Sequence, residues 1–117
     1  MNTSGHVYLV DDDESMRTSL SRMLRELGYN VHDFASAKAF IEHSVPIAPA
    51  VILLDMQMPD MTGLDLQEEL VRMGRKTPII FISGQSHPQQ IVKSLKKGAL
   101  DFLFKPFNLE DLLHSVT

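Results

Sequence analysis

The chain has 117 residues, 44% of them hydrophobic, which suits one domain with a single core. Its net charge of -4 and its scattered basic residues argue against a nucleic-acid-binding surface of its own. Because it contains no cysteine, it can form no disulfide, thiolate metal site or thiol nucleophile.

The chain begins with a predicted strand, an acidic turn and a helix. The apolar run from His6 to Val10 indicates a strand, and it stops at the acidic turn 11–14. This run is too short for a signal peptide or a membrane span, so we expect a cytoplasmic protein that does not enter a membrane. A helix should follow and end near Gly28, with an apolar stripe at helical spacing made of Met16, Leu20, Met23, Leu24 and Leu27.

The middle of the chain predicts two further pairs of strand and helix. Residues 31–34 alternate apolar and polar side chains, as an edge strand does, and Ser36 suits the N-cap of a short helix. The unbroken apolar run 51–54 ends at Asp55 and indicates a strand buried on both faces. The next helix should carry Leu66, Leu70 and Met73 on its apolar side and end near Gly74.

The last part predicts two more strands and two more helices. Residues 78–82 form an apolar strand that stops at Ser83, and residues 102–104 form a second one that stops at Lys105. A final helix should start at Asn108. The helix between these strands should bury Ile91, Val92 and Leu95, expose Lys93, Lys96 and Lys97, and end at Gly98.

Five strands alternating with five helices predict an α/β fold in one domain over residues 1–117. Its parallel sheet should carry helices on both faces, and in such doubly wound sheets ligands bind beyond the carboxyl ends of the strands. The residues that follow strand ends are therefore the candidates for a site: Asp11, Asp12, Asp55, Ser83 and Lys105.

Three carboxylates at one edge of a sheet would repel one another unless a cation holds them together. An oxygen-only ligand set suits a hard ion such as Mg²⁺ or Mn²⁺. The Ser83 hydroxyl and the Lys105 ammonium suit a phosphate group. Asp55 is then the candidate nucleophile toward phosphorus, because metal and lysine would neutralise charge on the transferring oxygens.

Each of these residues alone has a simpler interpretation. An acidic run before a helix usually caps it, which is the only role we assign to Asp13 and Glu14. A lone aspartate at a strand end is usually a turn residue. The coincidence of these residues at the same end of successive strands favours a site. The 5 histidines are dispersed in the sequence and the 7 methionines lack soft companions, so we assign neither group any chemistry.

The chain resembles the receiver domain of response regulators in bacterial two-component signalling. The segments that match are VYLVDDDES, VILLDMQMPDMTGLDL, TPIIFISGQ and KKGALDFLFKPF, and they occur in the order of the family over essentially the whole chain. The resemblance implies the flavodoxin-like (CheY-like) strand order 2-1-3-4-5. The Ser-Gly and Lys-Pro-Phe segments are most similar to the FixJ-type branch, whose members usually carry a C-terminal DNA-binding output domain. We expect any such domain to lie outside this chain.

The resemblance also implies roles for individual residues. Asp55 would accept a phosphoryl group from the phosphohistidine of a sensor histidine kinase. Mg²⁺ would be bound directly by Asp12 and Asp55, through water by Asp11, and by the backbone carbonyl of Gln57. Lys105 and Ser83 would contact the phosphoryl group and assist both phosphorylation and dephosphorylation. Ser83 and Phe102 would then switch the surface of the fourth helix, fifth strand and fifth helix, with a homodimer and transcription control as the expected output.

Three other classes of protein are alternatives to a phosphorylated receiver domain. A haloacid-dehalogenase-like phosphatase also forms an aspartyl phosphate, but it needs a second aspartate two residues after the nucleophile, where this chain has Gln57. A pseudo-receiver that only binds partners would not need the complete set of acids, hydroxyl and lysine. A nucleotide-binding Rossmann domain would need a glycine-rich turn after the first strand, and residues 11–14 are acidic instead.

Overall fold

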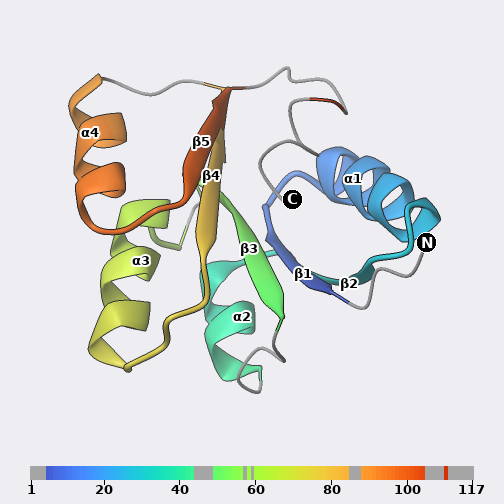
Figure 1. The fold of residues 1–117 in the computed structure, drawn as a ribbon, viewed down its shortest axis with the longest axis horizontal. Coiled ribbons are helices and arrows are strands. Elements are labelled where there is room, and N and C mark those ends of the chain that lie inside the picture. The colour runs from blue at the N-terminus through green and yellow to red at the C-terminus, as the bar shows by residue number, and fades with distance from the viewer. Residues whose placement is uncertain are drawn as a thin grey trace.

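A computed structural model describes residues 5–43, 49–56, 58, 60–84, 88–104 and 110. Its centre is a five-stranded parallel sheet in the order β2-β1-β3-β4-β5, as the resemblance implied (Figure 1). The strands are β1 (His6–Val10), β2 (Asn30–Phe34), β3 (Ala50–Asp55), β4 (Ile79–Ser83) and β5 (Asp101–Phe104). The helices with described bounds are α1 (Glu14–Glu26), α2 (Ala37–Glu42), α3 (Gly63–Arg72) and α4 (Pro88–Lys96).

The helices cover both faces of this sheet, as predicted. Along each strand, alternate side chains point to opposite faces, so the buried residues divide into two clusters. On one face Val7, Leu9 and Leu53 pack against α1, while on the other Tyr8, Ile52 and Leu54 pack against α2 and α3 (Figure 1). In the part of the chain that the structure describes, none of the helices combines the length and apolar character needed to cross a bilayer.

Local sequence signals set the ends of several helices. The Asp13 carboxylate accepts a hydrogen bond from the Met16 amide at 3.2 Å, so the predicted capping role is confirmed. The Ser36 hydroxyl caps α2 in the same way, accepting from the Ala39 amide at 3.1 Å. Beyond the C-terminal end of α4, Gly98 has a φ of 100°, a conformation that side chains other than glycine rarely adopt.

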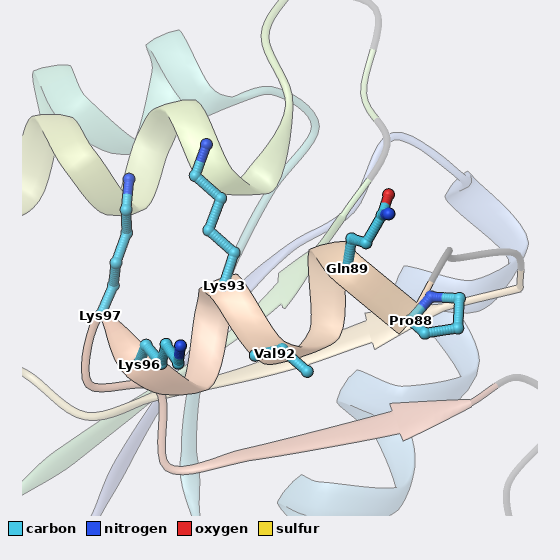
Figure 2. Close-up of a pocket in the computed structure, with 6 residues that line it drawn as sticks. All are labelled: Pro88, Gln89, Val92, Lys93, Lys96 and Lys97. Carbon is cyan, nitrogen blue, oxygen red and sulfur yellow. The ribbon is translucent and has the colours of Figure 1, made fainter.

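The buried side of α4 differs from the prediction. Val92 and Leu95 are 50% and 44% exposed, whereas Ser94 is fully buried. A hydrogen bond between the two helices explains this difference. The Gln67 side chain on α3 donates to the carbonyl of Ser94 at 3.1 Å, so the side of α4 that carries Ser94 faces α3. Figure 2 shows Lys97 extending toward α3, where it pairs with Glu68, and Val92 on the side away from that helix.

Two other residues assigned to apolar stripes also lie near the surface. Leu27 and Met73 are 38% and 42% exposed, because each is the C-cap residue of its helix and lies past the last buried turn. The predicted fifth helix falls on residues that, apart from Glu110, are outside those described.

Three of the histidines, although far apart in the sequence, come together beside β1, β2 and the end of α2. His6 and His32 are joined by a ring-to-ring hydrogen bond, Nδ1 to Nε2, of 3.1 Å. Tyr8 and His32 are register partners on adjacent strands, with ring centroids 4.6 Å apart. His43 lies 6.2 Å from His32 between ring centroids. Strand pairing therefore brings together three histidines that are dispersed in the sequence.

This histidine cluster should make the fold less stable in acid. Burial, and then the charges of His6, His43 and Arg25, lower the pKa of His32 from its ordinary value of 6.5. Below pH 6.5 the unfolded chain therefore binds more protons than the folded chain, and stability should fall as the pH drops from 6.5 toward the folded-state pKa. Urea unfolding between about pH 7.5 and about pH 5.5 measures this effect. His32→Gln should reduce the slope, and an unchanged slope would contradict this assignment.

Candidate functional site

The acidic residues predicted to form a site meet at one edge of the sheet. β1 ends at Val10, immediately before Asp11, and its neighbour β3 ends at Asp55. Because parallel neighbours end at the same edge, the residues that follow them lie close together. One carboxylate oxygen from each of Asp11, Asp12 and Asp55 lies within 4.8 Å of the other two.

The three carboxylates differ in burial. Asp11 is 0% and Asp55 5% exposed, whereas Asp12 lies at the surface. Oδ1 of Asp11 accepts a hydrogen bond from the Asp13 amide at 2.9 Å, which orients this carboxylate within the turn. Nη1 of Arg17 donates to the backbone carbonyl of Asp11 at 2.8 Å and ties the turn to α1. The site therefore has a fixed, buried floor and one carboxylate open to solvent.

The end of β3 is held by close backbone packing. The amide of Met56 donates to the Ile82 carbonyl at 3.0 Å, which extends the contact with β4 past Asp55. The amide of Gly63, the first residue of α3, donates to the Met56 carbonyl at 2.7 Å. A Cβ on Gly63 would lie 2.8 Å from the Asp55 carbonyl oxygen and 2.8 Å from a ring carbon of Phe81. Only glycine allows α3 to start so close to the acidic cluster.

Ser83 lies on the strand next to Asp55. It is the last residue of β4, it is 1% exposed, and its register partner on β5 is Phe104. Asp55 is the register partner of the preceding residue, Ile82. The structure therefore brings Ser83 to the same edge of the sheet as the three acids. Lys105 and Gln57, the other two predicted site residues, lie outside the described residues.

The predicted switch residue Phe102 is packed among aromatic rings on β4 and β5. Phe102 is 9% exposed. Its ring centroid lies 6.0 Å from the ring centroid of Phe81 and 5.3 Å from that of Phe104. Phe104 itself is 51% exposed. Phe102 thus lies at the boundary between the core and the surface of β5.

The donor set fits a hard divalent cation. It consists of carboxylate oxygens alone, and two ligands of one Mg²⁺ ion lie about 4 Å apart at most, given metal–oxygen distances of about 2.1 Å. The three oxygens meet this requirement with small side-chain movements, because all their separations are within 4.8 Å. Like charges this close also repel one another, so a cation would relieve an unfavourable arrangement.

We expect Asp12→Asn to raise the melting temperature in the absence of divalent cations. Removing one of three neighbouring charges should add on the order of 1 kcal/mol, or a few degrees, given that Asp12 is exposed. Mg²⁺ should raise the melting temperature of the wild type and do so much less in this variant. Differential scanning fluorimetry with and without Mg²⁺ measures both effects, with Glu42→Gln, an exposed acid at the end of α2, as the control. An equal response to Mg²⁺ in all three proteins would exclude this site.

Sequence reasoning missed two residues that shape this site, Arg17 and Gly63. A basic residue one turn into the helix after an acidic turn is a usable signal for Arg17. Thr62 and Asp65 form a capping box that starts α3. Their spacing in the sequence could have marked Gly63, which directly follows Thr62, as the first residue of this helix. The need for glycine there depends on distances to β3 and β4, which no local pattern contains.

Comparison with known families gives one match over nearly the whole chain. The family model described as response regulator receiver domain matches residues 7–117. Response regulator protein TmoT of Ectopseudomonas mendocina is 44% identical over 110 residues, which are 94% of this chain and 50% of that protein. Transcriptional regulatory protein FixJ of Bradyrhizobium diazoefficiens is 35% identical over 107 residues, which are 92% of this chain and 52% of that protein.

Solved structures agree with this result. The crystal structure of FixJ-N is 34% identical, with a TM-score of 0.87 and coverage of 99% of this chain and 92% of that one. The chain spans about half the length of the curated relatives it matches.

Proposed function

The chain belongs to the response regulator receiver domain family, and we propose that it stores a signal as a phosphoryl group on Asp55. The observation that carries this proposal is the meeting of Asp11, Asp12 and Asp55 within 4.8 Å at one edge of the sheet. A sensor histidine kinase would donate the phosphoryl group from a phosphohistidine. Because the family is a signalling family, any catalysis would be limited to the domain's own phosphorylation and dephosphorylation.

The chemistry is a phosphoryl transfer to a carboxylate. An oxygen of Asp55 attacks phosphorus and forms the acyl phosphate bond, while the bond from phosphorus to the histidine nitrogen breaks and its electron pair returns to the imidazole, which then takes a proton. Bound Mg²⁺ or Mn²⁺ would supply positive charge for the carboxylates and for the transferring oxygens. Asp12 and Asp55 would be its direct ligands, and Asp11 would act through water. The Asp11 carboxylate is held in place by the Asp13 amide, within the turn that Arg17 ties to α1.

Three more residues complete the proposed site. The Ser83 hydroxyl, at the end of the neighbouring strand, would donate a hydrogen bond to the phosphoryl group. Lys105 would pair with the same group, and the backbone carbonyl of Gln57 would join the metal ligands. The roles of Lys105 and Gln57 come from the family resemblance alone.

Phosphorylation would act on the surface through Ser83 and Phe102. It replaces the single negative charge of the Asp55 carboxylate with a phosphoryl group that carries about -1.5 to -2 charge units, which would draw Ser83 inward and change the packing of Phe102. The surface beside Phe102 carries exposed apolar residues on α4, on β5 and in the turn between them, and we propose that a homodimer forms there on phosphorylation. These residues are Val92, Leu95, Leu100 and Phe104, each at least 44% exposed. In a longer protein the dimer would control an output domain for transcription. The relative FixJ is named a transcriptional regulatory protein.

Incubation with acetyl phosphate and Mg²⁺ tests the proposal. Intact mass spectrometry should find one phosphoryl adduct that is stable in acid and labile in base, and none when EDTA removes the metal. The phosphorylated sample should also contain more dimer than the untreated one in analytical ultracentrifugation. An unmodified protein would overturn the receiver mechanism and favour a pseudo-receiver that only binds partners. Repeated turnover of a phosphomonoester would instead favour a phosphatase.

A further inference from the structure

The histidine cluster of His6, His32 and His43 lies far from the acidic cluster. His6 is the first residue of β1, whereas Asp11 directly follows the last one, so the two are separated by roughly 16 Å along the strand. His6 and His32 are partly exposed, and His43 is exposed. An ion from solvent can therefore reach the histidines without passing the proposed phosphorylation site.

Two ring nitrogens in this cluster face each other at a distance that suits two ligands of one metal ion. Nδ1 of His6 and Nε2 of His32 are 3.1 Å apart. Zn–N distances of about 2.0–2.1 Å place two nitrogens of one tetrahedral Zn²⁺ ion about 3.3 Å apart. The two rings are nearly parallel, with an angle of 17° between their planes. A small rotation of each ring is then sufficient for both nitrogens to bind the same ion.

The sheet and α2 hold these rings together before any ion binds. Tyr8 is 1% exposed, is the register partner of His32, and stacks on its ring with centroids 4.6 Å apart. His43 is the C-cap residue of α2, and its ring centroid lies 6.2 Å from that of His32. Because His43 is exposed, its ring can turn toward the pair. Ligands that are already in place lose less conformational freedom on binding.

The donor set selects the class of ion. Imidazole nitrogens suit Zn²⁺, Ni²⁺ and Cu²⁺, whereas Mg²⁺ prefers oxygen ligands such as those of the acidic cluster. The two clusters of this chain therefore differ in the metal that they should take.

We propose that the histidine cluster binds one divalent transition-metal ion of the Zn²⁺ class. Nδ1 of His6 and Nε2 of His32 are the first two ligands, His43 turns to supply the third, and water completes the coordination. The ion replaces the hydrogen bond between the rings, and the ring that donated that bond carries its proton on its other nitrogen instead. The bound ion links β1 to the edge strand β2 and to the end of α2.

Titration of the ¹⁵N-labelled protein with ZnCl₂ tests this site, at about pH 7.5, where imidazole is mostly neutral, and in excess Mg²⁺. Long-range ¹H–¹⁵N spectra of the histidine side chains should show Zn²⁺ on Nδ1 of His6 and on Nε2 of His32. Backbone shifts should concentrate on residues 5–8, 30–33 and 41–43. With three protein ligands, the Kd should be on the order of 10 μM.

Single variants separate the histidines from the acids, with the Kd for Zn²⁺ measured by calorimetry. His6→Gln and His32→Gln should each weaken binding about tenfold, and His43→Gln about threefold. Asp12→Asn is the matched control: it removes a carboxylate of the acidic cluster and should leave the Kd for Zn²⁺ unchanged.

Three results would each overturn the proposal. They are the absence of zinc-dependent shifts at the two ring nitrogens, an unchanged Kd in any of the three histidine variants, and loss of zinc binding in Asp12→Asn. The last would assign the ion to the acidic cluster. The ring-nitrogen spectra are recorded on the wild type, so they decide the matter even if a histidine variant folds poorly.

Discussion

Asp55→Asn should abolish covalent phosphorylation and still give a folded protein. The carboxylate oxygen is the nucleophile in the proposed reaction, and a neutral amide oxygen does not replace it. Asparagine has nearly the same shape as aspartate, so the packing at the end of β3 should persist. Because the change also removes one of three charges within 4.8 Å, the variant should be no less stable than the wild type without metal.

Intact mass and thermal unfolding measure these two outcomes on the same samples, after incubation with acetyl phosphate and Mg²⁺. Glu26→Gln, which removes an exposed acid in the last turn of α1, is the control and should be phosphorylated as the wild type is. If Asp55→Asn still acquires a phosphoryl group in full, the acceptor is another residue. If it fails to fold, Asp12→Asn tests the site separately, because Asp12 is exposed and should affect the metal more than the fold.

Gly63→Ala should destabilise the protein and disturb the acidic cluster at the same time. The new Cβ would meet two backbone atoms, the Asp55 carbonyl oxygen at 2.8 Å and Cα of Met56 at 3.0 Å, and a ring carbon of Phe81 at 2.8 Å. Backbone atoms cannot move aside as a flexible side chain can, so α3 must shift away from β3. Overpacking of this kind reduces stability by about 1–3 kcal/mol. Phosphorylation from acetyl phosphate should also slow, because α3 and the end of β3 share the Gly63 to Met56 hydrogen bond.

Gly5→Ala is the matched control for that change. A Cβ on Gly5 would make only ordinary contacts, at 3.8 Å or more, with Pro49 and Tyr29. Urea unfolding should therefore show a loss for Gly63→Ala and little change for Gly5→Ala. Equal stability of the two variants would mean that the start of α3 adjusts freely, and Gly63 would then have no special role at the site.

The alternation of apolar runs and helical stripes was sufficient to predict all five strands and the four helices whose bounds are described. The periodic pattern of apolar side chains along a strand or a helix is a local property, so it can be read without knowing the partner elements. The same reasoning placed Asp11, Asp55 and Ser83 at strand ends. Capping by Asp13 and Ser36 was equally local, because each cap bonds an amide three residues ahead.

Local patterns were insufficient wherever two elements meet. The side of α4 that is buried depends on the bond from Gln67 of α3 to Ser94, so the stripe that included Val92 and Leu95 was misjudged. The meeting of His6 with His32 depends on the register between β1 and β2. The strand order itself came from resemblance to a family and not from any periodicity.

For this protein, the sequence by itself determined the elements, their order along the chain and the residues that end each strand. Periodicity did not place β1 next to β3; the family resemblance implied this order, and only the tertiary structure shows that Asp11 and Asp12 then lie close to Asp55. The tertiary structure also decided that α3 starts close enough to β3 to require Gly63, and that His6 and His32 face each other. The physical reason is that apolar periodicity and capping depend on neighbours in the chain, whereas charge clusters, close approaches and cavities depend on distances between elements that only packing sets.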